Sequence, residues 1–155
     1  MIVTGANTEL TLSGESTFGK ATVQTDGTLV SSGNLTAAVD VKDTGTLVAS
    51  GNVKGDIDIA LGGTFKSGND TDKKLVLDGK FTSYKHDTNA ANNSVLDLDL
   101  RYGNRSDAAV AATGDVTLAG TLNITAQSSG IYNLFSSGGT LTRTGLTIGT
   151  AWDGT

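Results

Sequence analysis

The sequence has no cysteine and no proline, and aromatic residues account for only 5% of its 155 positions. Without cysteine, the chain can form neither a disulfide framework nor a thiolate metal site. The shortage of aromatic side chains argues against a wide globular core and favours a slim one. No apolar run is long enough to cross a bilayer as a helix, and no signal-peptide pattern follows Met1.

Positive charge is also scarce, because 11 Lys and Arg residues stand against 16 Asp and Glu residues and leave a net charge of −5. No cluster of basic residues stands out along the chain. Proteins that bind nucleic acids carry such a cluster as an electrostatic footprint. We therefore expect no nucleic-acid partner.

What the chain has instead is an internal repeat between residues 21 and 69. Asp-Gly-Thr-Leu at 26–29 returns as Thr-Gly-Thr-Leu at 44–47 and as Gly-Gly-Thr-Phe at 62–65, so the signature recurs with a constant 18-residue step. Self-similarity at a short fixed period is typical of a solenoid, in which each unit buries its apolar face only against its neighbours.

Apolar residues that alternate with polar ones follow the same step. This alternation has the period of a β-strand, so the apolar members are expected to stack inside the molecule as ladders of like side chains. One column comprises Ala21, Val39, Ile57 and Leu75, a second comprises Val23, Val41, Ile59 and Leu77, and the Gly-Thr-Leu signature adds Leu29, Leu47 and Phe65.

A unit of this length has no room for both a helix and a strand, whereas two or three short strands joined by Gly, Asn and Asp corners fit it well. The sequence therefore predicts an all-β fold, a parallel β-helix with about 18–19 residues per coil, as one domain over residues 1–155. At this step throughout, the chain would hold roughly eight coils spaced about 4.8 Å apart. Residues 1–20 are expected to form an earlier coil, with Leu10 aligned with Leu29.

Two polar segments interrupt the pattern. Residues 69–74 predict a corner before Leu75. Residues 84–94 contain no apolar ladder residue and are predicted to form a loop that leaves the rod. Beyond the loop, residues 116–118 are expected to repeat 98–100 at the step found earlier in the chain, and Gly-Thr-Leu at 139–141 is expected to repeat 120–122 at a step of 19.

The C-terminal third carries an ordered set of motifs. They are Leu-Asp-Leu-Asp-Leu at 96–100, Gly-Asp-Val-Thr-Leu-Ala-Gly-Thr-Leu-Asn-Ile at 114–124, Gly-Ile-Tyr-Asn-Leu-Phe at 130–135, Gly-Gly-Thr-Leu at 138–141 and Leu-Thr-Ile-Gly at 146–149. In this order they resemble the distal part of the passenger domain of pertactin-like bacterial autotransporters, which are type V secreted proteins. Residues 1–80 resemble that family only in having a Gly- and Thr-rich composition.

The resemblance implies a right-handed β-helix displayed on the surface of a Gram-negative cell or released from it. In that family the passenger is anchored in the outer membrane through a C-terminal β-barrel, which is absent from this chain and would be its only link to a membrane. The partners implied are a host surface protein, a glycan or another copy of the chain. The resemblance also implies that the C-terminal coils are similar to those from which folding of the passenger starts during secretion.

Few residues suggest chemistry. His86 is the only histidine and precedes Asp87, but sequence neighbours in a loop do not form a Ser/His/Asp arrangement, which the fold must assemble. The acids at 56 and 58, and those at 97 and 99, have a spacing that glycosidase carboxylates can adopt. Acids at alternate positions are, however, expected on the outer face of any strand. We assign no catalytic, metal-binding or cofactor-binding residue and expect no cofactor.

The favoured function is a rigid, non-enzymatic stalk segment of a passenger that serves adhesion or virulence. A polysaccharide-cleaving β-helix enzyme and a self-associating adhesin module are the alternatives. If one local surface makes a contact, the loop is the first candidate, through Tyr84, Lys85, His86, Asp87 and Asn92.

Overall fold

The computed structural model describes residues 1–67, 74–101, 107–126 and 130–152 of the chain. Within these ranges the regular structure consists of β-strands and one 3₁₀ turn, with no α-helix. The corner predicted at 69–74 lies outside the described residues, apart from Lys74. The strands are β1 (Ile2–Thr4), β2 (Glu9–Leu12), β3 (Glu15–Gln24), β4 (Thr28–Ser31), β5 (Asn34–Val41), β6 (Thr46–Ala49), β7 (Gly51–Lys54), β8 (Ile57–Ile59), β9 (Thr64–Ser67), β10 (Leu75–Asp78), β11 (Phe81–Ser83), β12 (Val95–Asp99), β13 (Val110–Ala112), β14 (Val116–Thr125), β15 (Phe135–Ser137) and β16 (Leu141–Trp152); the 3₁₀ turn η1 spans Ala90–Asn92.

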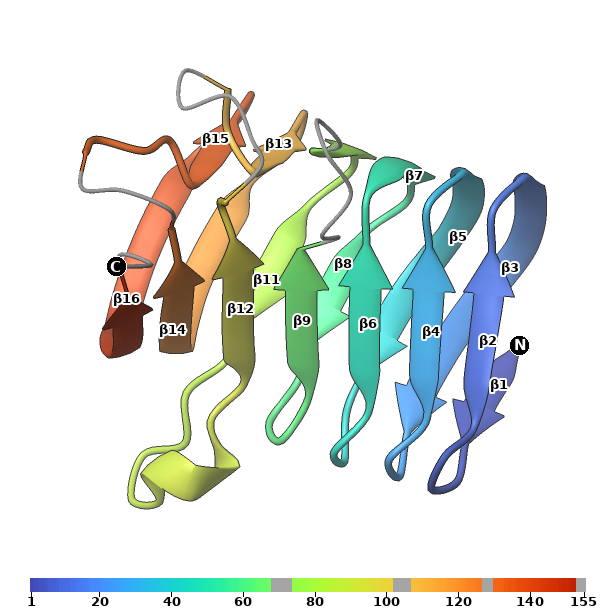
Figure 1. Cartoon of the computed structure of the whole chain (residues 1–155), viewed down its shortest axis with the longest axis horizontal. Helices are drawn as coiled ribbons and strands as arrows, with labels where there is room; N and C mark the ends of the chain where they lie inside the picture. The colour runs from blue at the N-terminus through green and yellow to red at the C-terminus, as the bar shows by residue number, and fades with distance from the viewer. Residues whose placement is uncertain (68–73, 102–106, 127–129, 153–155) are drawn as a thin grey trace.

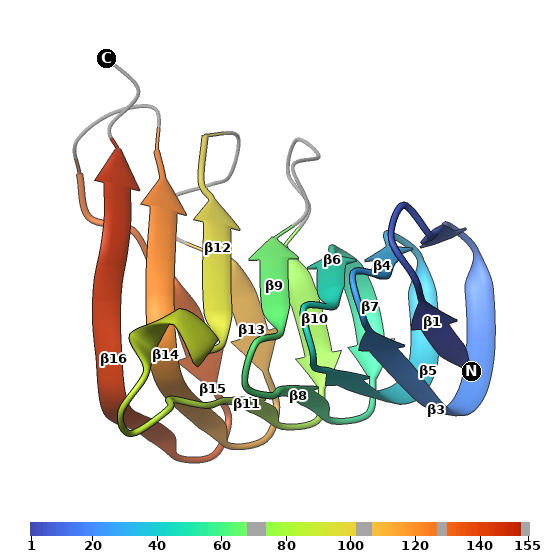
Figure 2. The same cartoon turned by 90° about the horizontal axis from the view of Figure 1, so that it is seen from below.

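All these strands belong to one sheet, whose hydrogen-bonded order is β15-β13-β10-β7-β5-β8-β11-β14-β12-β9-β6-β4-β2, with β1 paired to β3, β3 to β5 and β16 to β14. Every pairing is parallel. The fold is therefore all-β, as predicted, and its sheet is an open parallel one. β1 and β16 lie at opposite ends of the long axis (Figure 2).

The sheet contains three separate series of neighbouring strands, because the long strands β3, β5, β14 and β16 each bend and pair in two places. This defines three ladders. Ladder A contains β2, β4, β6, β9, β12 and the ends of β14 and β16. Ladder B contains the starts of β3 and β5, then β7, β10, β13 and β15. Ladder C contains β1, the ends of β3 and β5, β8, β11 and the starts of β14 and β16.

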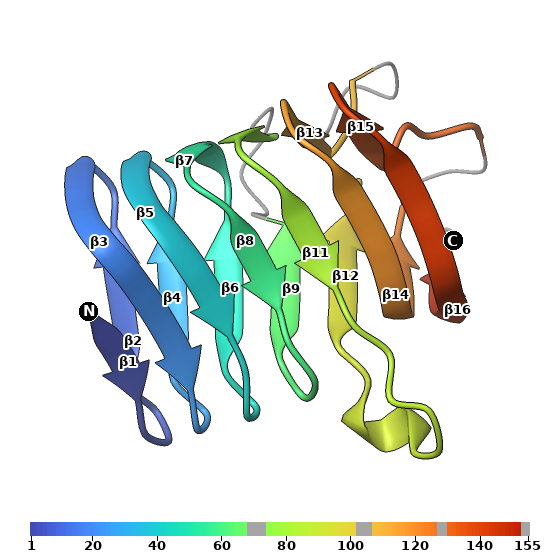
Figure 3. The same ribbon diagram turned by 180° about the vertical axis from the view of Figure 1, so that it is seen from behind.

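The chain visits ladders A, B and C in turn, and we call one such passage a round. Figure 1 shows ladder A as a row of strands side by side, and Figure 3 shows ladder C from behind. In the N-terminal half, the register follows the predicted 18-residue step, since Leu47 pairs with both Leu29 and Phe65. Leu10 pairs with Leu29, as expected for the earlier unit.

The side chains that point inward form the core. All eleven residues named as ladder members are at most 1% exposed. Three phenylalanines add bulk to it, one from each ladder: the rings of Phe65 and Phe81 lie 5.2 Å apart and those of Phe81 and Phe135 lie 5.5 Å apart. The core is slim and mostly aliphatic, as the low aromatic content indicates.

The predicted columns are wrong at their last members. Leu75 pairs with Gly51 and Val110 in ladder B, whereas the ladder C neighbour of Ile57 is Phe81. Leu77 lies beside Val53 and Ala112 in the same way, and Ser83 takes the place expected for it next to Ile59. The reason is a longer connection between β9 and β10, which raises the step in ladder B from 18, between Asn34 and Asn52, to 24, between Asn52 and Val76.

Two alignments beyond the loop are wrong for the same reason. β14 begins opposite β11, so residues 116–118 do not stack on 98–100. The start of β16 pairs with the start of β14, so residues 139–141 are not a repeat of 120–122. Long connections consume residues that the 18-residue estimate had assigned to coils, and ladder A accordingly has seven strands in the described part of the chain, not eight.

The corners that lead into ladder A explain the glycine of the repeat. Thr25 and Asp26 have φ angles of 50° and 60°, and Asp43 and Thr44 have 49° and 67°. Two consecutive positive values are the mark of a type I′ turn. At Gly45, which follows the second turn, an added Cβ would collide with backbone atoms of Val23 in the preceding round. Only glycine lets the two rounds approach to hydrogen-bonding distance there.

Candidate functional site

The outer face of ladder C carries two stacked carboxylates. Asp40 and Asp58 are register partners on adjacent strands, and Thr82 follows Asp58 in the next strand. Their inward neighbours in the strand are buried, so alternation turns these three side chains outward. Lys20 forms an ion pair with Asp40. We call Lys20, Asp40, Asp58, Thr82 and Tyr84 the acidic patch.

Like charges stacked in a parallel ladder repel each other, and this repulsion contributes to the shifted pKa values in the acidic patch. Partial burial, followed by the charge of Asp40, raises the pKa of Asp58. Hydrogen bonds from Thr82 and from the Tyr84 hydroxyl oppose this rise. Burial and the nearby Asp58 carboxylate also raise the pKa of Tyr84.

The loop at 84–94 joins β11 to β12 and is held by its own polar groups. The imidazole Nδ1 of His86 accepts hydrogen bonds from the backbone N–H groups of Thr88 and Asn89, at 3.2 and 3.1 Å. The backbone N–H of His86 donates to the side-chain oxygen of Asn93 at 2.8 Å. The Asn89 side chain caps η1 by accepting from Ala91. The segment therefore folds as a compact loop of defined shape.

The base of the loop is tied to several rounds of the stack. Ser94 donates its backbone N–H to the Tyr84 carbonyl at 3.1 Å and accepts the Tyr84 N–H through its hydroxyl at 2.9 Å. The Asn92 carbonyl accepts from the N–H of Gly62 in the preceding round. The Lys85 side chain lies so close to Gly145 that an added Cβ there would be 2.7 Å from the Lys85 Cδ.

The five contact residues predicted in the loop are not brought together into one constellation. Tyr84, Lys85, Asp87 and Asn92 are exposed, and His86 is partly buried. In the described part of the chain, the partners of His86 are backbone amides and Asn93, so no serine hydroxyl completes a triad around it. The residue that connects the loop to a charged surface is Tyr84, through Asp58.

In the second carboxylate pair, Asp97 and Asp99, it is Asp99 that makes structural contacts. The Arg101 guanidinium donates to both Asp99 carboxylate oxygens, and the shortest of these hydrogen bonds, from Nη2, measures 2.6 Å. This guanidinium lowers the pKa of Asp99. The Asp99 backbone N–H donates to the Ser67 hydroxyl in the neighbouring strand at 2.7 Å.

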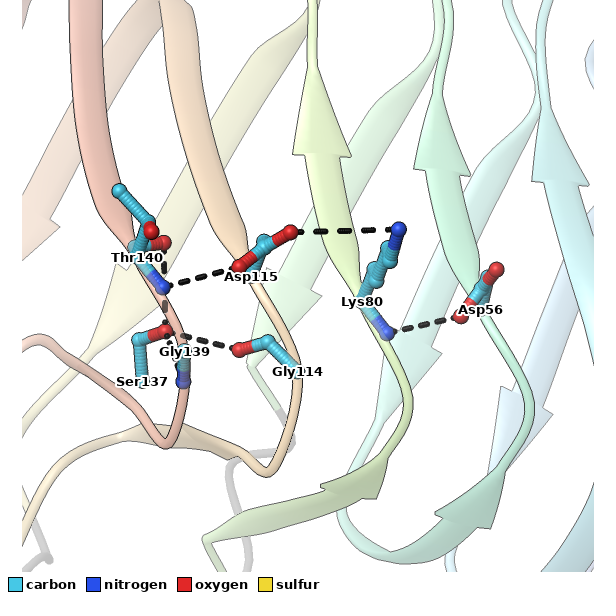
Figure 4. Close-up of polar contacts among 7 residues, drawn as sticks. All are labelled: Asp56, Lys80, Gly114, Asp115, Ser137, Gly139 and Thr140. Atoms are coloured by element: carbon cyan, nitrogen blue, oxygen red, sulfur yellow. Dashed lines mark hydrogen bonds and ion pairs between the residues drawn. The ribbon is translucent and has the colours of Figure 1, made fainter.

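A third polar feature lies at the corner between ladders B and C, where Asp56, Lys80, Asp115 and Thr140 follow one another in successive rounds (Figure 4). The Asp56 carboxylate accepts from the Lys80 backbone N–H at 2.8 Å, and the Asp115 carboxylate accepts from the Thr140 N–H at 2.9 Å. The Lys80 ammonium lies 3.9 Å from Asp115. Carboxylates engaged in this way join one round to the next and are poorly placed to bind a ligand.

Sequence reasoning missed both the acidic patch and this corner. The stacking of Asp40 on Asp58 was available from the repeat, because the two acids are one 18-residue step apart on outward positions. The corner was not, since Asp56, Lys80, Asp115 and Thr140 are separated by unequal steps.

Among the described residues, no group of three or more His, Cys, Asp or Glu side chains is arranged to hold a metal ion. None of the described helical residues forms a span long and apolar enough to cross a membrane. Comparisons with protein-family models, with curated proteins and with solved structures found no match to this chain.

Proposed function

We propose that the chain is a parallel β-helix in which each round through ladders A, B and C is one coil. The 18-residue register of the N-terminal half supports this, as does the order in which the ladders are visited. A coil of about 18–19 residues is the basic unit, and longer coils arise where connections are extended. The handedness proposed is right-handed, because connections between parallel strands of one sheet almost always turn that way.

The function we propose is that of a rigid stalk segment in the passenger of a surface-displayed or secreted autotransporter that serves adhesion or virulence. The observation that carries it is the unbroken parallel pairing along ladder A, from β2 to β16, over a column of inward apolar side chains that are at most 2% exposed from β4 to β14, namely Leu29, Leu47, Phe65, Leu96 and Leu122. Each strand is bonded to the next along its length, so bending the stack requires many hydrogen bonds to deform together. Such a body suits the presentation of a binding surface to a host protein or glycan.

Two measurements test this proposal. The first is the gene sequence downstream of Thr155, where we expect alternating segments of about ten residues typical of an outer-membrane barrel. The second is protease treatment of intact Gram-negative cells that express the complete gene with an epitope in the 84–94 loop. Loss of the epitope from intact cells supports surface display. An epitope that becomes accessible only after lysis, or a gene without such a barrel, contradicts it.

A polysaccharide-cleaving enzyme is the second candidate, and the raised pKa of Asp58 beside Tyr84 is the observation in its favour. Shifted carboxylates of this kind occur at catalytic sites, where a general acid must keep its proton near neutral pH. A panel of acidic and neutral polysaccharides incubated with the protein decides the question. The enzyme hypothesis requires product formation that Asp58→Asn abolishes and that Asp99→Asn leaves intact.

A further inference from the structure

The loop at 84–94 is held in shape by polar contacts and not by the core. It projects from the stack beside β12 and carries the turn η1 (Figure 1). Its less polar side chains, Tyr84, Ala90 and Ala91, are exposed, and its two buried residues, Asn93 and Ser94, are polar. The shape of the loop therefore depends on hydrogen bonds and gains little from the burial of apolar surface.

These hydrogen bonds form a closed cycle that starts and ends at His86. The His86 imidazole accepts the N–H groups of Thr88 and Asn89. The Asn89 side chain caps η1, and the carbonyl of the first residue in η1 accepts the Asn93 N–H at 3.2 Å. The Asn93 side chain in turn accepts the His86 N–H at 2.8 Å. Each contact positions the next, so the loss of one link loosens the others.

The two hydrogen bonds to the imidazole exist in only one of its charge states. Both partners are N–H donors, so Nδ1 of His86 presents a lone pair and Nε2 carries the proton of the neutral ring. In the imidazolium both ring nitrogens are donors. Protonation therefore removes both hydrogen bonds and turns three N–H groups toward one another. Histidine is the side chain whose charge ordinarily changes between about pH 5 and pH 8.

Other charged or titratable groups lie around the imidazole. In the corner of the preceding round, residues 60–63 carry no charge. None of the surrounding groups forms a hydrogen bond or ion pair with the imidazole in the described part of the chain, so none replaces the two N–H contacts. These groups are Lys85 and Asp87 in the loop, Tyr84 and Asp58 at its base, Asp43 in the corner beyond Gly62, and Arg143 near Gly145, which Lys85 contacts.

We propose that the loop at 84–94 is an acid-sensitive switch, which is closed while His86 is neutral and opens when its imidazole is protonated. Opening changes the surface formed by Tyr84, Lys85, Asp87 and Asn92, the residues predicted to make a contact. A partner that recognises the closed loop would be bound at neutral pH and released in acid. This consequence rests on the proposed contact function, whereas the switch itself does not.

The test is NMR of the isotopically labelled parent chain from about pH 8 to pH 5. The nitrogen chemical shifts of the imidazole report its tautomer, and the Nε2–H form is expected at neutral pH. Backbone order parameters of residues 87–92 should be about 0.85 at neutral pH and fall below about 0.6 once the imidazole has titrated. Those of Val41 and Ile59 in ladder C should stay high, which shows that the stack remains folded.

His86→Asn is the matched control, because an asparagine side chain accepts from the N–H two residues ahead and does not titrate. Its loop should stay rigid at both ends of the pH range, whereas the loop of His86→Ala should be mobile at both.

A parent loop that stays rigid after the imidazole has titrated overturns the proposal, as does an imidazole whose Nδ1 carries the proton at neutral pH. An asparagine variant that loosens in acid like the parent also overturns it, because another group would then be responsible. So does an alanine variant with a rigid loop. The parent titration decides the question by itself if a variant does not fold. None of these measurements depends on whether the chain is an autotransporter segment.

Discussion

At the scale of single residues, two buried serines in the otherwise mostly apolar core show how hydrogen bonding of a buried hydroxyl affects stability. Ser31 and Ser83 are both 1% exposed. Ser83 donates to the Ala119 carbonyl at 2.8 Å and accepts from the Ala119 N–H at 3.0 Å. The Ser31 hydroxyl, in contrast, has no hydrogen-bond partner within the described ranges. The same side chain is thus satisfied in one position and unsatisfied in the other.

The first prediction uses this pair. Ser31→Ala removes an unpaired buried hydroxyl and should raise the free energy of unfolding by about 1 kcal/mol. Ser83→Ala removes the hydroxyl that pairs with the Ala119 N–H and leaves the Ala119 carbonyl with only the Ser94 hydroxyl at 3.5 Å, so it should lower the free energy of unfolding by about 1–3 kcal/mol. Denaturant unfolding followed by circular dichroism measures both. Destabilisation by Ser31→Ala similar to that by Ser83→Ala would show that the Ser31 hydroxyl is satisfied in solution.

The second prediction concerns backbone strain at the corners. Thr25 has a φ angle of 50° and Thr44 one of 67°, which β-branched residues adopt at a cost of about 1–2 kcal/mol. Thr44 has compensation, because its hydroxyl accepts from the Asp26 N–H at 3.1 Å. Thr25→Asn should therefore raise the melting temperature, since asparagine tolerates this region. Thr44→Asn is the matched control and should bring a smaller gain or a loss. Equal gains from both variants would argue against a stabilising role for the Thr44 hydrogen bond.

At the scale of the strand ladder, the outward acids have opposite linkage to pH. The pKa of Asp58 is raised in the folded state, so its protonation favours folding and its charge opposes folding above that pKa. The pKa of Asp99 is lowered, so its ionised form stabilises the fold and this contribution is lost as pH falls through the folded pKa. Both carboxyls have an unfolded pKa of about 3.9.

The third prediction follows from these signs. At pH 7, Asp58→Asn should stabilise the protein and Asp99→Asn should destabilise it, the latter by less than about 1 kcal/mol because the ion pair with Arg101 is partly exposed. Both differences should shrink below about pH 4, where the unfolded carboxyls are protonated. Unfolding curves at pH 3.5, 5 and 7 for the parent and both variants measure this. A stability gain for Asp58→Asn that is unchanged at pH 3.5 would show that it does not arise from charge.

The strand ladders also show how much of the fold could be predicted from the sequence. The alternation from Ala21 to Ile59 was sufficient to predict the all-β fold, the buried ladder residues and their register. It was insufficient beyond β9, because the number of residues in a connection is not encoded in the strands that it joins. Leu75 has the right spacing for ladder C but enters ladder B. The acidic patch depends on pairing across strands, and its link to Tyr84 depends on the conformation of the loop.

At the scale of the whole molecule, the two ends of the stack differ. Leu141 and Ile148 occupy inward positions in the last strand but are 53% and 56% exposed, whereas Val3 at the other end is only 3% exposed. Arg143 also occupies an inward position, beside Leu118 in the preceding strand. The last strand thus carries one charge among its inward apolar positions. Inward-pointing charges are a known means of discouraging strand addition at an open edge.

The fourth prediction is that the isolated 155-residue chain associates end to end, because its last strand exposes apolar side chains and unpaired backbone groups. Arg143→Leu should strengthen this association by removing the charge from the core position. Arg143→Lys, which retains the charge, is the control. Light scattering across a concentration series measures the mass of each. A parent and an Arg143→Leu variant that both remain monomeric at high concentration would contradict the prediction.

The unequal steps of ladder A have a consequence for engineering. One strand spacing along the axis is covered by an 18-residue step between Thr46 and Thr64 but by a 31-residue step between Thr64 and Val95. Axial length is therefore set by the number of rounds and is independent of the number of residues, so inserted sequence extends sideways. A foreign peptide placed in the 84–94 loop should leave the length of the stack unchanged. Two such grafts on different rounds would be separated along the axis by whole multiples of about 4.8 Å, which makes the molecule a discrete spacer for displayed groups.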